Sequence, residues 1–153
     1  MTAQEKTPTL QQRLRGLAAF LPQFEQPGFC FGHWDTPEGA CIPWYSLSRV
    51  ASEFIHAAYD LGWVRLDFDW VRWKQTPEAI QLRDDAQTLD RATPEQLSWL
   101  LTVVICQDRY CDGELADAFE SGLLTAICRR AAQLESETEE GMYNDGPATI
   151  SFA

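Results

Sequence analysis

Residues 93–134 constrain the fold of this chain more than any other stretch. The stretch opens with Thr-Pro-Glu-Gln, in which Thr can cap a helix, Pro suits the first helical position and Gln completes a capping box. Apolar residues recur at helical spacing over 97–105 and again over 115–134, after a break at 111–113 where Asp112 can cap the second helix. Two amphipathic helices joined by a short connection predict an antiparallel helical hairpin, with Gly122 inside its second helix. In the competing interpretation Gly122 is the C-cap glycine, with positive φ, of a short helix over 113–121.

Helix signals also occur upstream of this hairpin. Apolar residues keep helical spacing over residues 10–24 behind Thr9, over 48–62 and over 76–86. Residues 29–45 instead hold two short apolar-aromatic runs around a Pro- and Gly-bearing turn, which suits either a β-hairpin or an irregular aromatic loop. We therefore predict a mainly α fold, with about five helices around the C-terminal hairpin and a minor β-hairpin or extended element near 29–45.

The chain is expected to form one helical domain over residues 9–134. With 153 residues, 45% of them hydrophobic, it can bury a substantial single core. Residues 1–8 are polar and are expected to be disordered. Residues 135–153 combine a block of acidic residues with low hydrophobicity, which predicts a mostly disordered acidic tail.

Charge and composition limit the partners of the domain. The net charge is −11, from 23 acidic and 12 basic residues, and this disfavours direct nucleic-acid binding, which needs basic surface. No run approaches the roughly 18 apolar residues of a membrane span, so we expect no membrane partner. Five cysteines without a signal peptide predict a reduced, cytoplasmic protein.

The sequence predicts neither a metal nor a cofactor. Cys30, His33 and Cys41 could supply two or three zinc ligands, but a structural zinc site needs four and no second Cys pair completes the set. The chain has no glycine-rich phosphate loop, no GxSxG and no HExxH. We therefore expect no catalytic activity of these classes.

Arg109 is the most informative charged residue, because it lies at the predicted end of a helix and next to Tyr110. One interpretation is a partly buried clasp in which Arg109 pairs with Glu120 or Asp69 and holds the hairpin closed. In the alternative interpretation its guanidinium binds a carboxylate or phosphate of a ligand. The first is favoured.

Aromatic residues are concentrated in the first half of the chain. Five of the six tryptophans, together with several Phe and Tyr residues, lie between residues 29 and 73. Such density is typical of a binding surface or pocket, yet tryptophan also fills cores between irregular segments. The sequence therefore leaves two interpretations of these residues open, as core filling or as the lining of a binding pocket.

Several short motifs resemble a family of small bacterial domains with no assigned function. The motifs are Leu100-Leu101-Thr102, Asp108-Arg109-Tyr110-Cys111-Asp112-Gly113, Glu120-Ser121-Gly122 and Arg129-Arg130, with Phe68-Asp69-Trp70 and Trp73 upstream. The resemblance covers residues 47–134 and departs from the family pattern at Tyr110, where Phe is expected. It implies a family but no activity.

The leading functional hypothesis is a non-catalytic protein-binding or regulatory module that engages another protein through its aromatic segment. It predicts a flat exposed apolar patch among Trp34, Trp44 and Tyr45. The alternative is a small-ligand or enzymatic site lined by Trp70, Trp73, Arg109 and nearby carboxylates, which predicts a dry cleft. The candidate binding residues under the two hypotheses are Asp69, Trp70, Trp73, Arg109, Tyr110, Glu120, Trp34, Trp44 and Tyr45.

Overall fold

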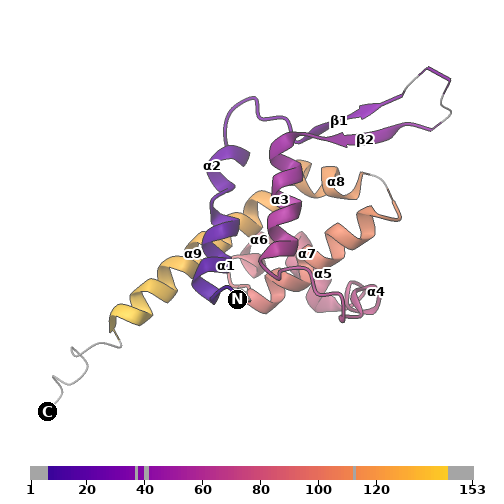
Figure 1. Ribbon diagram of the computed structural model, residues 1–153. Coiled ribbons are helices and arrows are strands. Elements are labelled where there is room, and N and C mark those ends of the chain that lie inside the picture. Colours follow the sequence, from indigo (N-terminus) through magenta and orange to yellow (C-terminus); the bar gives the residue numbers. More distant parts are fainter. Residues whose placement is uncertain (1–6, 37, 40–41, 112, 145–153) are drawn as a thin grey trace, which may run out of the picture.

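The computed structural model describes residues 7–36, 38–39, 42–111 and 113–144. The helices are α1 (Leu10–Ala18), α2 (Leu21–Phe24), α3 (Arg49–Asp60), α4 (Trp70–Trp73), α5 (Pro77–Asp84), α6 (Ala86–Leu89), α7 (Pro94–Asp108), α8 (Glu114–Glu120) and α9 (Leu123–Asn144). Two antiparallel strands, β1 (Gly32–Asp35) and β2 (Trp44–Leu47), form a hairpin that projects from the helices (Figure 1). The mainly α prediction is confirmed, and a β-hairpin occupies the region for which two interpretations were open.

Side-chain caps start the helices where the sequence predicted them. The hydroxyls of Thr9, Ser48, Thr76 and Thr93 each accept a backbone N–H from the first turn of α1, α3, α5 and α7. At Thr9 and Thr93 a glutamine three residues later bonds back to the cap, which completes two capping boxes. The predicted cap Asp112 lies outside the described residues, and the residue before α8 is Gly113.

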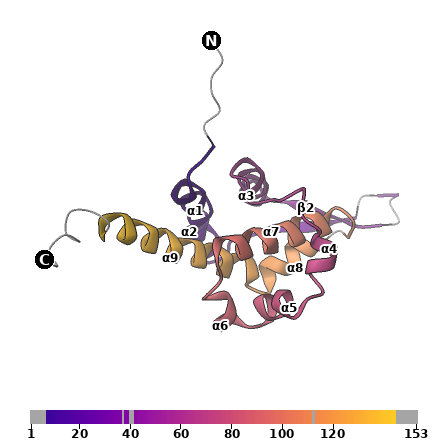
Figure 2. The ribbon, with the colours of Figure 1, turned by 90° about the horizontal axis from the view of Figure 1, so that it is seen from below.

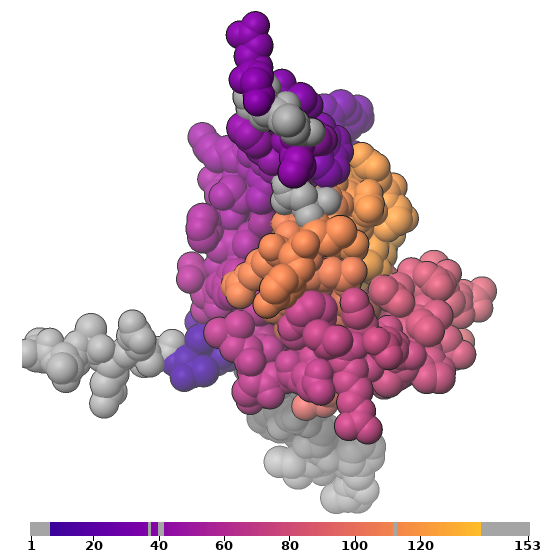
Figure 3. Space-filling view, turned by 90° about the vertical axis from the view of Figure 1, so that its right-hand side faces the viewer, coloured from indigo at the N-terminus to yellow at the C-terminus, as the bar shows by residue number. Residues whose placement is uncertain are grey.

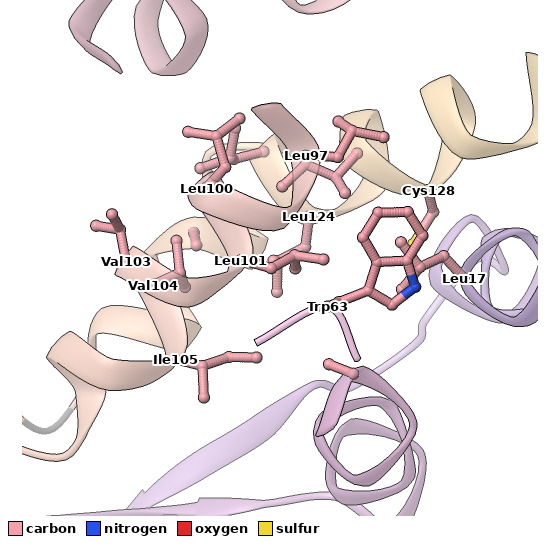
Figure 4. Close-up of a cluster of buried hydrophobic side chains, with 14 of the residues drawn as sticks. Leu17, Trp63, Leu97, Leu100, Leu101, Val103, Val104, Ile105, Leu124 and Cys128 are labelled. Carbon is pink, nitrogen blue, oxygen red and sulfur yellow. The ribbon is translucent and has the colours of Figure 1, made fainter. Parts of the chain in front are cut away.

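Helix α7 is the centre of the fold rather than an amphipathic surface helix. Between Leu97 and Cys106 every residue except Trp99 is buried, so that neighbours surround this helix on nearly all sides (Figure 4). A helix that is apolar all round needs cover on every face. Figure 2 shows this cover, with α1 and α3 on one side of α7 and α5 and α6 on the other.

The second half of the predicted hairpin is divided into two helices. Gly122 has a φ of +88° and separates α8 from α9, so the prediction of one helix running through Gly122 is wrong and the alternative of a glycine C-cap is correct. Helix α9 then packs along α1 and continues to Asn144 (Figure 1). Residues 135–144, for which disorder was expected, are helical, whereas residues 145–153 lie outside the described range.

We expect Gly122→Ala to lower the free energy of unfolding by about 1–2 kcal/mol. An L-residue pays roughly this amount in the left-handed region, and a Cβ at Gly122 would meet no atom within 4 Å, so the cost comes from the backbone alone. Gly122→Asn should cost clearly less, because Asn tolerates this conformation. Urea denaturation of the three proteins measures the difference. Equal losses for Ala and Asn would contradict a purely conformational role.

Trp63 joins α3 to the centre of the molecule. Its ring is fully buried, and its indole N–H donates to the carbonyl of Arg13 at 3.2 Å. The carbonyl of Trp63 accepts a hydrogen bond from the Ser98 hydroxyl at 2.5 Å, which ties the segment after α3 to α7.

Within the described ranges, no helix is both long and apolar enough to cross a membrane.

Candidate functional site

The β-hairpin has two different faces, which its register defines. Trp34 pairs with Tyr45 and Asp35 pairs with Trp44. Because neighbouring residues of a strand point to opposite faces, Trp34 and Tyr45 share one face and Trp44 lies on the other. The flat patch expected from Trp34, Trp44 and Tyr45 together is therefore divided between two faces.

Trp34 lies over the turn that joins α7 to α8. Its ring packs against bare backbone at Gly113, where an added Cβ would come within 2.7 Å of the indole. Gly113 also has a φ of +100°, so both its conformation and its neighbour require glycine. The ring of Trp34 meets that of Tyr45 edge-on, with centroids 5.3 Å apart. The other side of Trp34 faces solvent, since 52% of the residue is exposed.

A second aromatic pair lies at the other side of the same turn. Trp70, the first residue of α4, stacks on Tyr110 with ring centroids 6.4 Å apart. Tyr110 is 83% exposed, which is the largest exposure among the large hydrophobic side chains described. The ammonium group of Lys74 lies 5.6 Å from the Trp70 ring and adds a cation–π contact.

We call the two pairs Trp34, Tyr45, Trp70 and Tyr110 the aromatic face. Segments that are far apart in the sequence contribute to it: the hairpin, the start of α4 and the turn after α7. Figure 3 shows these segments one below another on one side of the molecule, with the hairpin uppermost, the end of α7 and α8 in the middle and α4 below. The fold thus gathers four of the nine predicted binding residues around the turn at residues 109–113.

Carboxylates border the aromatic face. Burial raises the pKa of the Tyr45 phenol, and the neighbouring charges of Cys30, Glu120 and Asp108 raise it further. The last two place acidic groups from α8 and α7 beside the hairpin. The predicted binding residue Glu120 is the last residue of α8 and is exposed there.

Arg109 takes a partner that the sequence did not reveal. Its guanidinium donates to the hydroxyl of Tyr59 on α3 and lies 5.5 Å from that ring. Among the described residues no ion pair joins Arg109 to Asp69 or Glu120, so the predicted clasp is replaced by a contact with α3. Asp69 instead caps α4 by accepting the N–H of Arg72 at 3.2 Å.

The remaining predicted tryptophans have different environments. Trp73 is buried, and its indole N–H donates to Glu78 at 2.7 Å, which makes it part of the core. Trp44 is 46% exposed on the far face of the hairpin, where Ser46 donates to Asp35 at 2.5 Å and His33 lies 3.2 Å from the same carboxylate. Core and surface interpretations of the tryptophan cluster are thus each correct for part of it.

The proposed zinc ligands do not form a described cluster. Cys41 lies outside the described residues, and within the described ranges no three His, Cys, Asp or Glu side chains are placed to hold a metal ion. Cys30 and Cys111 are exposed, whereas Cys128 lies in the core, where burial raises the pKa of its thiol well above the usual range.

Sequence reasoning missed several residues that build this region. Tyr59 accepts a hydrogen bond from Arg109, and Gly113 packs against the ring of Trp34. Of these two residues, only Gly113 carried a sequence signal, as part of the motif after Tyr110. Thr102 was noticed for its motif, but no role was assigned to it. The partners of Tyr59 and Thr102 lie 50 and 37 residues away in the chain, beyond the reach of local patterns.

Comparison with known proteins identifies a family. No curated protein and no solved structure matches the chain. A family model, described as a family of unknown function, matches residues 9–137 and so spans every element from α1 into α9. The match includes the hairpin, the turn at residues 109–113 and α4, which together form the aromatic face. The chain belongs to this family of unknown function, DUF6508.

Proposed function

We propose that the domain is a non-catalytic protein-binding module and that its aromatic face contacts the partner. The observation that supports this is the convergence of Trp34, Tyr45, Trp70 and Tyr110 around one turn, while Trp34 and Tyr110 stay largely exposed. Exposing large rings forfeits hydrophobic free energy in the isolated domain, and a partner that covers them recovers it. Trp and Tyr are also the residues most enriched among interface hot spots.

The aromatic pairs are held in place before any partner binds. Trp34 is held between Tyr45 and Gly113, and Trp70 is held between Tyr110 and Lys74. Side chains that are already ordered lose less conformational entropy on association, which favours affinity. The hairpin also offers an elongated support that reaches beyond the helices (Figure 1).

The geometry favours a contact surface over a reaction centre. A catalytic site would need Arg109 and carboxylates to converge, but the partner of Arg109 in the described structure is the Tyr59 hydroxyl, and Asp69 caps a helix. Trp73, which would line the same site, is buried and bonded to Glu78. These three residues serve the fold, which supports a role for their exposed neighbours in binding.

A double variant of the aromatic face tests the proposal. Trp34→Ser with Tyr110→Ser removes two exposed rings, and Leu10→Ser with Ile80→Ser is the matched control, since it removes exposed apolar groups from α1 and α5. Quantitative affinity enrichment from an extract of the native cells, with chemical crosslinking, measures binding. We expect a partner bound by the wild type and the control to fall at least about tenfold with the face variant, which corresponds to about 1.4 kcal/mol.

The outcome is decisive in either direction once the variants are shown to be folded. Circular dichroism and melting temperature should be close to the wild type for both double variants, because all four positions are substantially exposed. Equal enrichment by the face variant and the wild type would contradict the proposal. So would a loss that is the same for the control.

A further inference from the structure

Two adjoining grooves share the side chains of Arg13 and Arg65. One groove has a volume of about 360 Å³ and runs past the end of α3, and the other has a volume of about 470 Å³ and runs between the starts of α1 and α7. We propose that these grooves bind a small phosphorylated molecule, with the guanidinium groups of Arg13 and Arg65 as the ligands of its phosphate group. This site is separate from the aromatic face and does not rest on the function proposed for it.

Arg13 is fixed in position by the fold. Its Nε donates to the carbonyl of Leu61 at 2.8 Å and its Nη2 donates to the carbonyl of Gly62 at 3.2 Å. The central carbon of its guanidinium lies over the Trp63 ring, 4.4 Å from the ring centroid. Nη1 has no hydrogen-bond partner among the described residues, so one end of a rigid fork is available to a ligand.

Arg65 brings a second guanidinium to the same place. Its backbone N–H donates to the Thr102 hydroxyl at 2.9 Å, which anchors the residue to α7. Its side chain is about half exposed, and its closest carboxylate within the described chain is Asp67, with a long N–O distance of 3.6 Å. An exposed pair of this length contributes little to stability, so the donors of Arg65 are also available.

The arrangement of these two charges is unfavourable without a ligand. Burial lowers the pKa of Arg13, and the charge of Arg65 lowers it further. The chain has 23 acidic and only 12 basic residues, yet Arg13 makes no ion pair with a carboxylate in the described part of the structure. Like charges at close range repel, and an anion between them converts this repulsion into attraction.

Phosphate suits this geometry better than a single carboxylate does. A phosphate dianion carries two charges for two guanidinium groups and presents several oxygens to their planar forks. The start of α7 also borders the larger groove, and the positive end of its dipole favours an anion there. Grooves of several hundred Å³ leave room beyond the phosphate for the rest of a small molecule.

A substitution of Glu95 should change the affinity for the anion in the opposite direction from a substitution of Arg65. It borders the larger groove together with both arginines, and its carboxylate forms no ion pair with them in the described structure. A negative charge at this position opposes anion binding. Removing it should therefore strengthen binding, whereas removing the charge of Arg65 should weaken it.

Inorganic phosphate and glycerol 3-phosphate are the probes, titrated into the full chain at constant ionic strength while NMR follows the amide and arginine Nε–H signals. Acetate is the comparison anion. The variants are Arg65→Gln and Glu95→Gln, with Arg83→Gln as the matched control because it makes the same charge change outside the two grooves. Arg13 is left unchanged, because its side chain bonds the end of α3.

We expect saturable changes in the NMR chemical shifts of Arg13, Arg65 and Glu95. Glycerol 3-phosphate should bind more tightly than inorganic phosphate. Arg65→Gln should raise the dissociation constant at least about tenfold, Glu95→Gln should lower it, and Arg83→Gln should leave it unchanged; a tenfold change corresponds to about 1.4 kcal/mol. Shifts that do not saturate would overturn the proposal. So would acetate binding as tightly as phosphate, or equal effects of Arg65→Gln and Arg83→Gln.

Discussion

Trp63→Ala is expected to lower the free energy of unfolding by about 3–5 kcal/mol, the usual cost of removing a large buried aromatic ring. Trp63 is fully buried among the side chains shown in Figure 4, near Leu17, Leu101 and Cys128. The truncation leaves a cavity between α1, α7 and α9. It also removes the surface beneath the Arg13 guanidinium and the bond from the indole to the Arg13 carbonyl.

Guanidinium denaturation followed by circular dichroism measures this loss. Trp44→Ala is the matched control, since it removes the same side chain from a position that is 46% exposed on the hairpin. The control should change stability by less than about 1 kcal/mol. Similar losses for both variants would show that the ring of Trp63 is not the centre of the core.

Thr102→Val is expected to cost about 1–3 kcal/mol, although it preserves side-chain shape and apolar volume. The Thr102 hydroxyl is fully buried, donates to the Ser98 carbonyl at 2.8 Å and accepts the Arg65 N–H at 2.9 Å. Valine leaves the N–H of Arg65 without its partner, and an unsatisfied buried donor costs roughly this amount. The loss should be accompanied by faster amide exchange at Arg65.

Thr125→Val is the matched control for this substitution. Thr125 also lies inside a helix, α9, but its hydroxyl makes no hydrogen bond within the described part of the chain. Because both variants replace Thr with Val in a helix, helix propensity contributes equally to both. A Thr102→Val protein that is as stable as Thr125→Val would show that the contact between α7 and Arg65 contributes nothing to folding.

The motifs that carry the family resemblance mainly hold the fold together. Thr102 anchors the segment after α3, Gly113 and Gly122 adopt positive φ on either side of α8, and Arg130 donates to the Ala92 carbonyl at 2.9 Å before α7. Tyr110 differs from these residues, because its ring is exposed and stacks on Trp70. This division explains why the motifs identify a family while implying no activity.

Local chemistry explains which parts of the fold the sequence could predict. The caps at Thr9, Ser48, Thr76 and Thr93 involve residues three positions apart, so their hydrogen bonds follow from sequence spacing alone. The apolar run from Leu97 to Ile105 likewise identifies a helix before any partner is known. For the same reason the mainly α class could be predicted and is confirmed.

Gly122 shows where local patterns become ambiguous. The apolar stripe continues in phase on both sides of it, which suits one continuous helix as well as two helices joined by a glycine cap. The packing of α8 and α9 decides between them, because α9 leaves Gly122 in the direction that lies along α1. Helix α9 also continues past Leu134 to Asn144, and Glu135 at the start of this extension pairs with Arg15 of α1 at 3.0 Å.

The sequence by itself determined the helical class, the caps and the list of aromatic candidates; the tertiary structure alone decided which of those candidates meet. Trp34 and Trp44 each lie in a short apolar-aromatic run, but the strand register turns them to opposite faces of the hairpin. Trp70 and Tyr110 are 40 residues apart and stack only because α4 packs on α7. Periodicity describes one element at a time, whereas a binding face depends on how elements pack, and that packing minimises the free energy of the whole chain rather than of any segment.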